Sequence, residues 1–296
     1  MLEKIKNIIL KTDRFLYKKF GSDKSTKVLQ NIREAQTLFS YLQTVEGESN
    51  TRFVGGCVRK AISGEEIDDI DVATSYEPKE IKLKLNKPGV KIIDTGIAHG
   101  TVTVILNNKK FEITTLRKDI YTDGRHATVQ FTNDWKEDAL RRDFTFNSLY
   151  ADEHGNIMDP TGQGFKDIEN KVLRFIGEPS QRIKEDYLRV IRYFRFLSNY
   201  TENVDKNSFE ACINNAKSIR FLSSERIIQE LNKIFKDINY IRAINILIKY
   251  NLLQYIYSSS SFNNFKPQEK YLNVILKKFF KRDNFLKNPF LFFTSL

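Results

Sequence analysis

Two carboxylates that follow a glycine turn are the residues of this chain best suited to chemistry. Gly55-Gly56 and Arg59 come first, and Asp69 and Asp71 follow at positions i and i+2. On a strand, residues two apart point to the same face, so the two aspartates would lie side by side. Adjacent carboxylates repel each other unless a cation lies between them, and Mg²⁺ prefers oxygen ligands. Glycine lets the backbone approach a phosphate closely. The pattern predicts a site for a metal ion and a triphosphate.

We expect Asp69 and Asp71 to be the metal ligands and the catalytic residues of a phosphoryl or nucleotidyl transfer, a reaction that depends mainly on positioning and charge neutralisation. Glu112, on a predicted strand over 111–115, could supply a third carboxylate. Arg59 and Gly56 would contact a phosphate bound at the turn. The alternative for an Asp-x-Asp pair alone is a solvated strand edge, but the upstream Gly-Gly-x-x-Arg favours catalysis.

A second cluster is Arg141-Arg142-Asp143. Arg142 could bind a triphosphate, because a guanidinium group matches phosphate oxygens. Asp143 could accept a hydrogen bond from a ribose hydroxyl. A local patch of surface ion pairs explains the same residues equally well.

A third cluster begins at Glu185-Asp186 and continues through Arg189, Arg192 and Arg195. A helix here would make Asp186 and Arg189 i, i+3 neighbours, and they could simply pair with each other. A more specific use is base selection. Cytosine and adenine each present an amino donor beside a ring-nitrogen acceptor, which suits a carboxylate and a guanidinium; guanine and uracil present the reverse pattern.

These residues must be held by elements of two kinds. The spacing of apolar residues predicts helices over 1–48, 58–64 and 78–85. Strands are expected over 52–54, 67–72, 90–93, 101–106 and 110–116. Asn107-Asn108 predicts a hairpin turn. Beyond the turn-rich segment 159–164, long helical patterns over 180–257 replace the mixed pattern, so we expect an α+β chain with a small mixed sheet followed by helices.

Composition indicates which partners and which cellular location suit this chain. The formal net charge of +11 indicates either a lysine-rich surface or an anionic partner such as nucleic acid. The two cysteines have no metal-ligand spacing and form no disulfide framework, which favours a reducing, cytoplasmic location. No apolar run is long enough for a membrane span.

Taken together, the motifs resemble those of class II CCA-adding tRNA nucleotidyltransferases and bacterial poly(A) polymerases. The matching segments, in chain order, are Gly55-Gly56-Cys57-Val58-Arg59 with Asp69-Ile70-Asp71, Glu112-Ile113-Thr114-Thr115-Leu116-Arg117 with Asp123-Gly124-Arg125-His126, Arg141-Arg142-Asp143-Phe144-Thr145, Glu185-Asp186-Tyr187-Leu188-Arg189, and Ser224-Glu225-Arg226-Ile227 with Glu230 and Lys233.

The resemblance implies a polymerase-β-like nucleotidyltransferase head over 49–158, a helical neck over 159–235 and a helical body over 236–296, after an N-terminal helical extension over 1–48. It implies Mg²⁺ bound by the two aspartates. The nucleotide-binding residues it implies are Gly56, Arg59, Arg142, Asp143, Asp186, Arg189, Arg192 and Arg195. Asp186 and Arg189 would act as a protein template for C and A, and Asp123-Gly124-Arg125-His126 resembles the loop that switches the enzyme from CTP to ATP.

The expected function is therefore addition of C, C and A to the 3′ end of tRNA from CTP and ATP, with release of pyrophosphate. A poly(A) polymerase or A-adding enzyme of the same family stays open, because the Asp186–Arg189 pair does not exclude it. A catalytically degenerate RNA-binding protein is a further alternative, which the intact aspartate pair opposes. Two departures stand out: Lys60 occupies a position where the family usually has Asp, and the chain ends earlier than typical members, so part of the tRNA-binding body or tail is expected to be shortened.

Overall fold

The computed structural model describes residues 27–42, 50–122, 127–200, 203–237 and 239–256. The chain divides into two compact units. Residues up to 121 together with 127–170 form the first, and the second comprises 122–126 and the residues from 171 onward.

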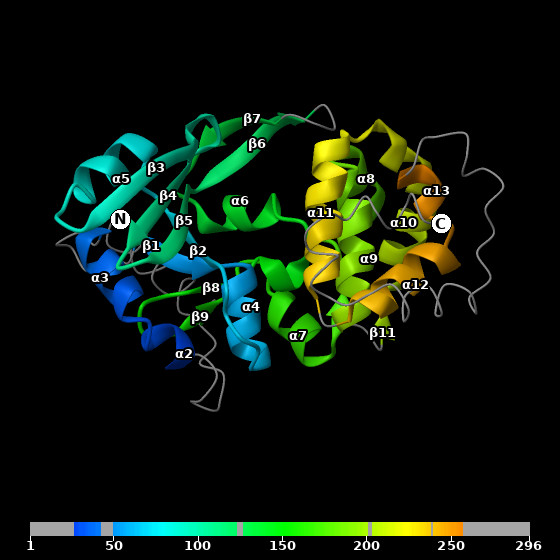
Figure 1. Ribbon diagram of the computed structural model, residues 1–296, viewed down its shortest axis with the longest axis horizontal. Coiled ribbons are helices and arrows are strands. Elements are labelled where there is room, and N and C mark those ends of the chain that lie inside the picture. Colours follow the sequence, from blue (N-terminus) through cyan, green and yellow to red (C-terminus); the bar gives the residue numbers. More distant parts are fainter. Residues whose placement is uncertain (1–26, 43–49, 123–126, 201–202, 238, 257–296) are drawn as a thin grey trace, which may run out of the picture. The chain divides into compact units, whose positions relative to one another are not determined.

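A seven-stranded mixed sheet is the framework of the first unit (Figure 1), with strand order β3-β4-β5-β2-β1-β8-β9. Its strands are β1 (Thr51–Val54), β2 (Ile70–Thr74), β3 (Val90–Gly96), β4 (Thr101–Leu106), β5 (Lys109–Thr115), β8 (Tyr150–Ala151) and β9 (Ile157–Met158). The β2–β5 pair is parallel and the other pairs are antiparallel. Two further strands, β6 (Arg117–Thr122) and β7 (Ala127–Phe131), form a separate pair. The expected α+β class with a mixed sheet is confirmed.

Helices pack against this sheet because their apolar residues recur on one face. They are α2 (Lys27–Gln30), α3 (Arg33–Leu42), α4 (Gly56–Ser63), α5 (Pro78–Lys84), α6 (Trp135–Leu140) and α7 (Gly164–Glu169), with 3₁₀ turns η1 (Ile97–His99) and η2 (Thr145–Asn147). Leu38, Phe39 and Leu42 of α3 are buried, and the ring centroid of Phe39 lies 4.8 Å from that of Phe53 in β1. The described part of the N-terminal segment thus belongs to the core of this unit.

Most element boundaries follow from local signals. The predicted strand over 101–106 is confirmed as β4, and Asn107 and Asn108 adopt positive φ angles of 48° and 63°, as a tight hairpin turn requires. Gly64 ends α4 in the left-handed conformation. The strand expected over 67–72 was placed too early, because β2 begins only at Ile70.

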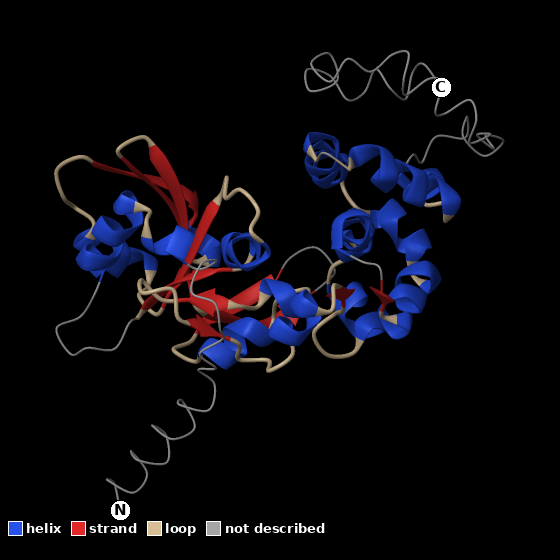
Figure 2. Cartoon of the chain, turned by 90° about the horizontal axis from the view of Figure 1, so that it is seen from below, coloured by secondary structure: helices blue, strands red, loops and turns tan. Residues whose placement is uncertain are grey.

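The described residues of the second unit are mostly helical (Figure 2). The helices are α8 (Pro179–Glu185), α9 (Leu188–Tyr200), α10 (Lys206–Asn214), α11 (Ser224–Lys236), α12 (Tyr240–Lys249) and α13 (Leu253–Ile256), with the 3₁₀ turn η3 (Ala216–Phe221). Among its described residues, the only sheet is the short parallel pair of β10 (Val172–Leu173) and β11 (Asn203–Val204). Aromatic rings fill its core: Tyr193 stacks on Phe175 at 5.7 Å, and Phe194 lies 5.8 Å from Tyr250.

The helical pattern expected over 180–257 is interrupted at Asp186. Asp186 lies between α8 and α9 in an extended conformation, with φ −155° and ψ 105°. Its own carboxylate accepts a hydrogen bond from the Leu188 N–H at 3.1 Å, which satisfies a donor at the start of α9. Nowhere in the described ranges is a helix both long and apolar enough to cross a membrane.

Candidate active site

The turn before α4 requires glycine at position 55. Gly55 has φ +70° and ψ −121°, a conformation that L side chains rarely adopt, and its N–H donates to the Leu149 carbonyl at 3.1 Å. It precedes the first turn of α4 without a side-chain cap. A Cβ added at Gly56 would meet nothing within 4 Å. The N-terminal amides of α4 therefore begin at an open turn, a suitable place for an anion.

The two predicted carboxylates flank Ile70, which is buried in the core. Asp71 belongs to β2 and pairs in parallel register with Glu112 of β5, while Asp69 directly precedes the strand. Burial, and next the negative charge of Glu112, raise the pKa of Asp71 to about 6, and Asp69 adds to this effect. The carboxylates therefore repel each other when all are ionised.

This donor set fits a hard divalent cation, because such an ion would relieve the repulsion with oxygen ligands. Among the described residues, no three acidic, histidine or cysteine side chains are grouped closely enough to hold a metal ion together. Glu112 forms an ion pair with Lys110, whose Nζ lies 2.6 Å from Oε1. Asp69 and Asp71 thus remain the candidate ligands, and Glu112 acts on Asp71 through its charge.

Arg142 lies beside both features. Its Nη1 is 3.6 Å from the position that a Cβ on Gly55 would take, and its positive charge lowers the pKa of Asp71. The guanidinium is bound by Asp138, with Nη2 2.9 Å from Oδ2. The arginine predicted to bind a triphosphate is therefore next to the glycine turn.

Arg59 and Asp143 belong to one hydrogen-bonded chain. Arg59 is buried and its Nη1 donates to Asn147 Oδ1 at 2.6 Å, while Asn147 Nδ2 donates to Asp143 Oδ1 at 3.2 Å. Asp143 Oδ1 also accepts from the Phe144 N–H at 2.9 Å. These contacts connect α4 to η2, so both residues fix the backbone around the glycine turn.

In the second unit, Asp186 and Arg189 have separate partners. Arg226 of α11 donates from Nη2 to Asp186 Oδ2 at 2.9 Å. Arg189 is buried and donates from Nη1 to Glu185 Oε2 at 2.7 Å and to the Arg182 carbonyl at 2.6 Å. Both side chains are thus held in place by α8 and α11.

Arg192 and Arg195 share one buried acid, Glu230 of α11, which is 1% exposed. Arg195 Nε donates to Glu230 Oε1, and Arg192 Nη1 lies 3.9 Å from Oε2. Burial alone would raise the pKa of Glu230, but the positive charges of Arg195 and Arg192 outweigh it and lower the pKa. Arg192 and Arg195 of α9 are therefore anchored on α11.

Comparison with known proteins gives matches to two family models, over different parts of the chain. Residues 51–174 match the model of the poly(A) polymerase head domain, and residues 203–260 match that of a probable RNA- and SrmB-binding site of polymerase A. The chain belongs to the family of CCA-adding enzymes and poly(A) polymerases. The polymerase-β-like head expected from the motifs is confirmed.

Relatives in this family include human mitochondrial CCA tRNA nucleotidyltransferase 1, which is 41% identical over 216 residues, or 72% of this chain and 50% of that protein. The CCA-adding enzyme of Streptococcus pyogenes is 36% identical over 235 residues, 79% of this chain and 55% of that protein. The crystal structure of the Bacillus stearothermophilus CCA-adding enzyme in complex with CTP has a TM-score of 0.66 and 34% identity, over 76% of this chain and 53% of that one. The chain spans about half the length of the curated relatives it matches.

Within this family fold, several residues of the site were not predicted from the sequence. Asp138 and Asn147 contact the predicted arginines Arg142 and Arg59. One signal pointed to Asp138: Asp134 caps α6 by accepting from the Lys136 N–H, and Asp138 stands three and four positions before the arginine pair. Asn147 had no such signal, because its partner is distant in the chain. Asp123-Gly124-Arg125-His126, the proposed switching loop, lies outside the described residues.

Lys60, the departure from the family pattern, forms an ion pair with Asp68. Asp68 also accepts a hydrogen bond from the Asp69 N–H at 2.9 Å. Lys60 thus connects α4 to the segment that carries the first candidate metal ligand.

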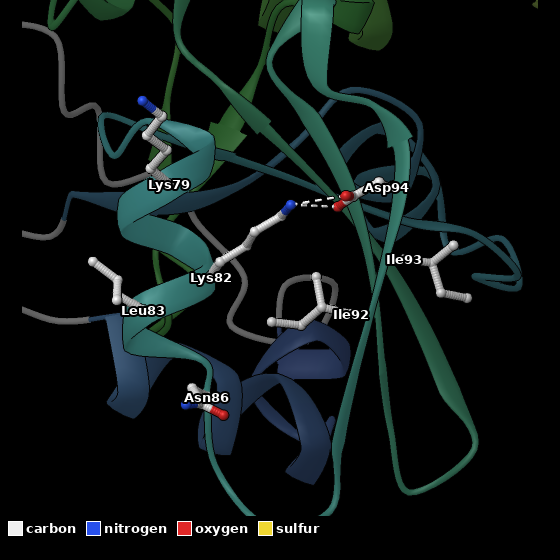
Figure 3. Close-up of a pocket in the computed structure, with 7 residues that line it drawn as sticks. All are labelled: Lys79, Lys82, Leu83, Asn86, Ile92, Ile93 and Asp94. Carbon is white, nitrogen blue, oxygen red and sulfur yellow. Dashed lines mark hydrogen bonds and ion pairs between the residues drawn. The ribbon is translucent and has the colours of Figure 1, made fainter.

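A separate pocket of about 780 Å³ lies between α5 and β3 (Figure 3). The ion pair between Lys82 Nζ and Asp94 Oδ1, 2.7 Å apart, crosses it. Its lining residues are Lys79, Lys82, Leu83, Asn86, Ile92, Ile93 and Asp94. None of them belongs to the candidate active site.

Proposed function

We propose that this protein is a nucleotidyltransferase that adds C, C and A to the 3′ end of tRNA from CTP and ATP, without a nucleic-acid template. The observation that carries this proposal is the acid pair Asp69 and Asp71 beside the Gly55 turn and the Arg142 guanidinium. That arrangement provides oxygen ligands for cations and donors for phosphates in one place. The similarity to CCA-adding enzymes supports this choice of nucleotides.

The reaction proposed is attack of the tRNA 3′ hydroxyl oxygen on the α-phosphorus of the nucleotide. A new P–O bond forms, the bond to the β-phosphate breaks, and pyrophosphate leaves with its electron pair. Asp69 and Asp71 would hold Mg²⁺, which supplies positive charge to the attacking and leaving oxygens when bound. Ionised Asp71 is required for this, so the metal and a proton compete for its carboxylate.

The head residues would orient the triphosphate. We assign phosphate contacts to the Gly56 amide and to Arg142, since an open helix N-terminus and a guanidinium both favour anions. Arg59 and Asp143 would contact the nucleotide at the same turn. Their hydrogen bonds to Asn147 support this assignment, because they fix the backbone of the turn.

The helical unit would choose the base. Asp186 would accept from the amino group of cytosine or adenine and Arg189 would donate to the ring nitrogen, while Arg192 and Arg195 would complete the nucleotide-binding set. The hydrogen bonds of Asp186 with Arg226 and of Arg189 with Glu185 support this assignment, because rigid donors and acceptors discriminate better than mobile ones. Replacing Arg189 with Ala is then expected to weaken the preference for CTP and ATP. A reducing location such as the cytoplasm agrees with the free, buried thiols of Cys57 and Cys212.

The test is incorporation of labelled CTP and ATP into tRNA that lacks its 3′-terminal CCA, with Mg²⁺ present. We expect both nucleotides to be incorporated and the Asp71→Ala variant to be inactive, while tRNA binding by that variant remains nearly unchanged. Incorporation of ATP but never of CTP would identify an A-adding enzyme instead. tRNA binding without any transfer would identify a protein that has lost catalysis.

A further inference from the structure

Asp138 is a carboxylate that the proposed chemistry does not use, although it lies at the centre of a polar cluster in the head. It is 1% exposed. Oδ1 accepts from Arg141 Nε at 2.9 Å, and Oδ2 accepts from Arg142 Nη2 at 2.9 Å and from the Tyr150 hydroxyl at 2.6 Å. Each oxygen thus takes one arginine of the pair.

The geometry of this cluster follows from the elements around it. Asp138 is on α6, and Arg141 and Arg142 follow at i+3 and i+4, where a helical turn brings side chains together. Tyr150 is fully buried in β8 opposite Val54, the last residue of β1 before Gly55. The Trp135 ring packs edge-on against Tyr150 at 5.2 Å. The acceptor for Arg142 is therefore fixed by both the helix and the sheet.

The Nη1 side of this arrangement points to the glycine turn. While Nε and Nη2 of Arg142 are engaged by Asp138, Nη1 is the atom that lies 3.6 Å from the Cβ position of Gly55. A guanidinium held along one edge by a carboxylate still presents its other edge to an anion. An arginine side chain that rotates freely would lose conformational entropy on binding a phosphate. Asp138 lowers that cost, because it holds the Arg142 guanidinium before the ligand arrives.

We propose that Asp138, assisted by Tyr150, is a positioning residue that orients Arg142 toward the triphosphate of the incoming nucleotide. This inference rests on the proposed function in so far as the ligand is a nucleoside triphosphate. It assigns Asp138 no contact with the substrate. The base is recognised elsewhere, so loss of Asp138 should affect CTP and ATP equally, and inorganic pyrophosphate as well.

The experiment is a titration of the full chain with CTP, ATP and inorganic pyrophosphate, because binding can be measured whether or not the protein turns over. For Asp138→Asn we expect each dissociation constant to rise about tenfold, in the range typical for a lost charge-assisted hydrogen bond. The ratio of the CTP and ATP constants should stay the same. In an Arg142→Ala background, Asp138→Asn should add less than about twofold, because the effect passes through Arg142.

Asp167→Asn is the matched control. Asp167 is also 1% exposed in the head, and it accepts hydrogen bonds from the neutral side chains of Thr145 and Gln163. Its replacement should lower the melting temperature and leave the three dissociation constants unchanged. If Asp138→Asn does not fold, Tyr150→Phe keeps the carboxylate and removes one hydrogen bond to it, and should weaken all three ligands about threefold, since the loss of one neutral hydrogen bond is smaller.

Unchanged constants in Asp138→Asn, or in Tyr150→Phe if the first variant is unfolded, would overturn the positioning role. An equal effect of Asp138→Asn with and without Arg142 would also overturn it. These results are independent of the incorporation assay: wild-type protein that binds nucleotides in this pattern but transfers none would refute the proposed function and leave the positioning role standing.

Discussion

Two aspartates of the head show how environment divides one residue type between two tasks. Asp71 is half-buried near Glu112 and Asp69, and its pKa is raised to about 6. Burial acts on Asp138 in the same direction, but Arg142 and Arg141 outweigh it and hold the pKa of that carboxyl well below its usual range. The charge of Asp138 is already compensated by the chain's own arginines, whereas at Asp71 burial and neighbouring acids prevail, as expected for a carboxylate proposed to bind a metal ion.

At the residue scale, we predict that Mg²⁺ stabilises the protein through Asp71. The raised pKa means that the metal-free folded state takes up a proton more readily than the unfolded chain, so ionising Asp71 costs stability as the pH rises from about 4 to about 6. Mg²⁺ should therefore raise the melting temperature at pH 7.5 and much less at pH 5. Metal-free Asp71→Asn should be at least as stable as metal-free wild type at pH 7.5.

Thermal melts with Mg²⁺ or with a chelator, at both pH values, provide the measurement. Asp94→Asn is a control, since that carboxylate pairs with Lys82 outside the site and its loss should leave the Mg²⁺ effect intact. An equally large Mg²⁺ shift in Asp71→Asn would remove Asp71 from the ligand set.

At the scale of elements, the helical unit depends on charged side chains that join neighbouring helices. Glu230 of α11 binds Arg195 and Arg192 of α9, and Arg226 of α11 binds Asp186 between α8 and α9. The break between α8 and α9 leaves Asp186 in an extended backbone, where its carboxylate can reach α11. In a continuous helix, the direction of the Asp186 side chain would be set by the helical geometry instead.

We predict that Glu230→Gln destabilises this unit by about 3 kcal/mol, because removing one partner of a buried ion pair leaves the other charges uncompensated. The pKa of Glu230 is lowered, so its contribution is present at neutral pH and is lost only as the pH falls through the folded-state pKa. Chemical denaturation at pH 7 measures this. Glu210→Gln removes an exposed pair with Lys206, 3.7 Å apart, and should cost less than about 0.5 kcal/mol. Equal losses in the two variants would contradict the bridging role of Glu230.

At the scale of the whole molecule, the formal net charge of +11 supports an anionic partner. We predict that tRNA binding weakens at least about tenfold between about 50 and about 200 mM salt, because several phosphate contacts release counterions. Electrophoretic mobility shifts or fluorescence titration at several salt concentrations would test this. CTP affinity, which depends on few contacts, should vary much less over the same range. A salt-independent tRNA affinity would show that the positive charge is not used for RNA.

The sequence by itself determined the glycine turn, the aspartate pair, the order of the motifs and the change from a mixed to a helical pattern. These depend on residues close together in the chain, where glycine φ angles, strand alternation and turn preferences act locally. The pattern also predicted that Glu112 lies on a strand, which is β5 in the structure. It did not show that Glu112 would pair with Asp71 of β2.

Only the tertiary structure decided which partner each charged side chain takes. Arg142 is held by Asp138 and Tyr150, Asp186 by Arg226, and Arg59 by Asn147. Two of these pairs, Asp186–Arg226 and Arg59–Asn147, join segments 40 and 88 residues apart. Their energies depend on burial and on distances of a few ångströms, which no local pattern records. The residue types therefore indicated the chemistry, while the orientation of those residues depended on folding.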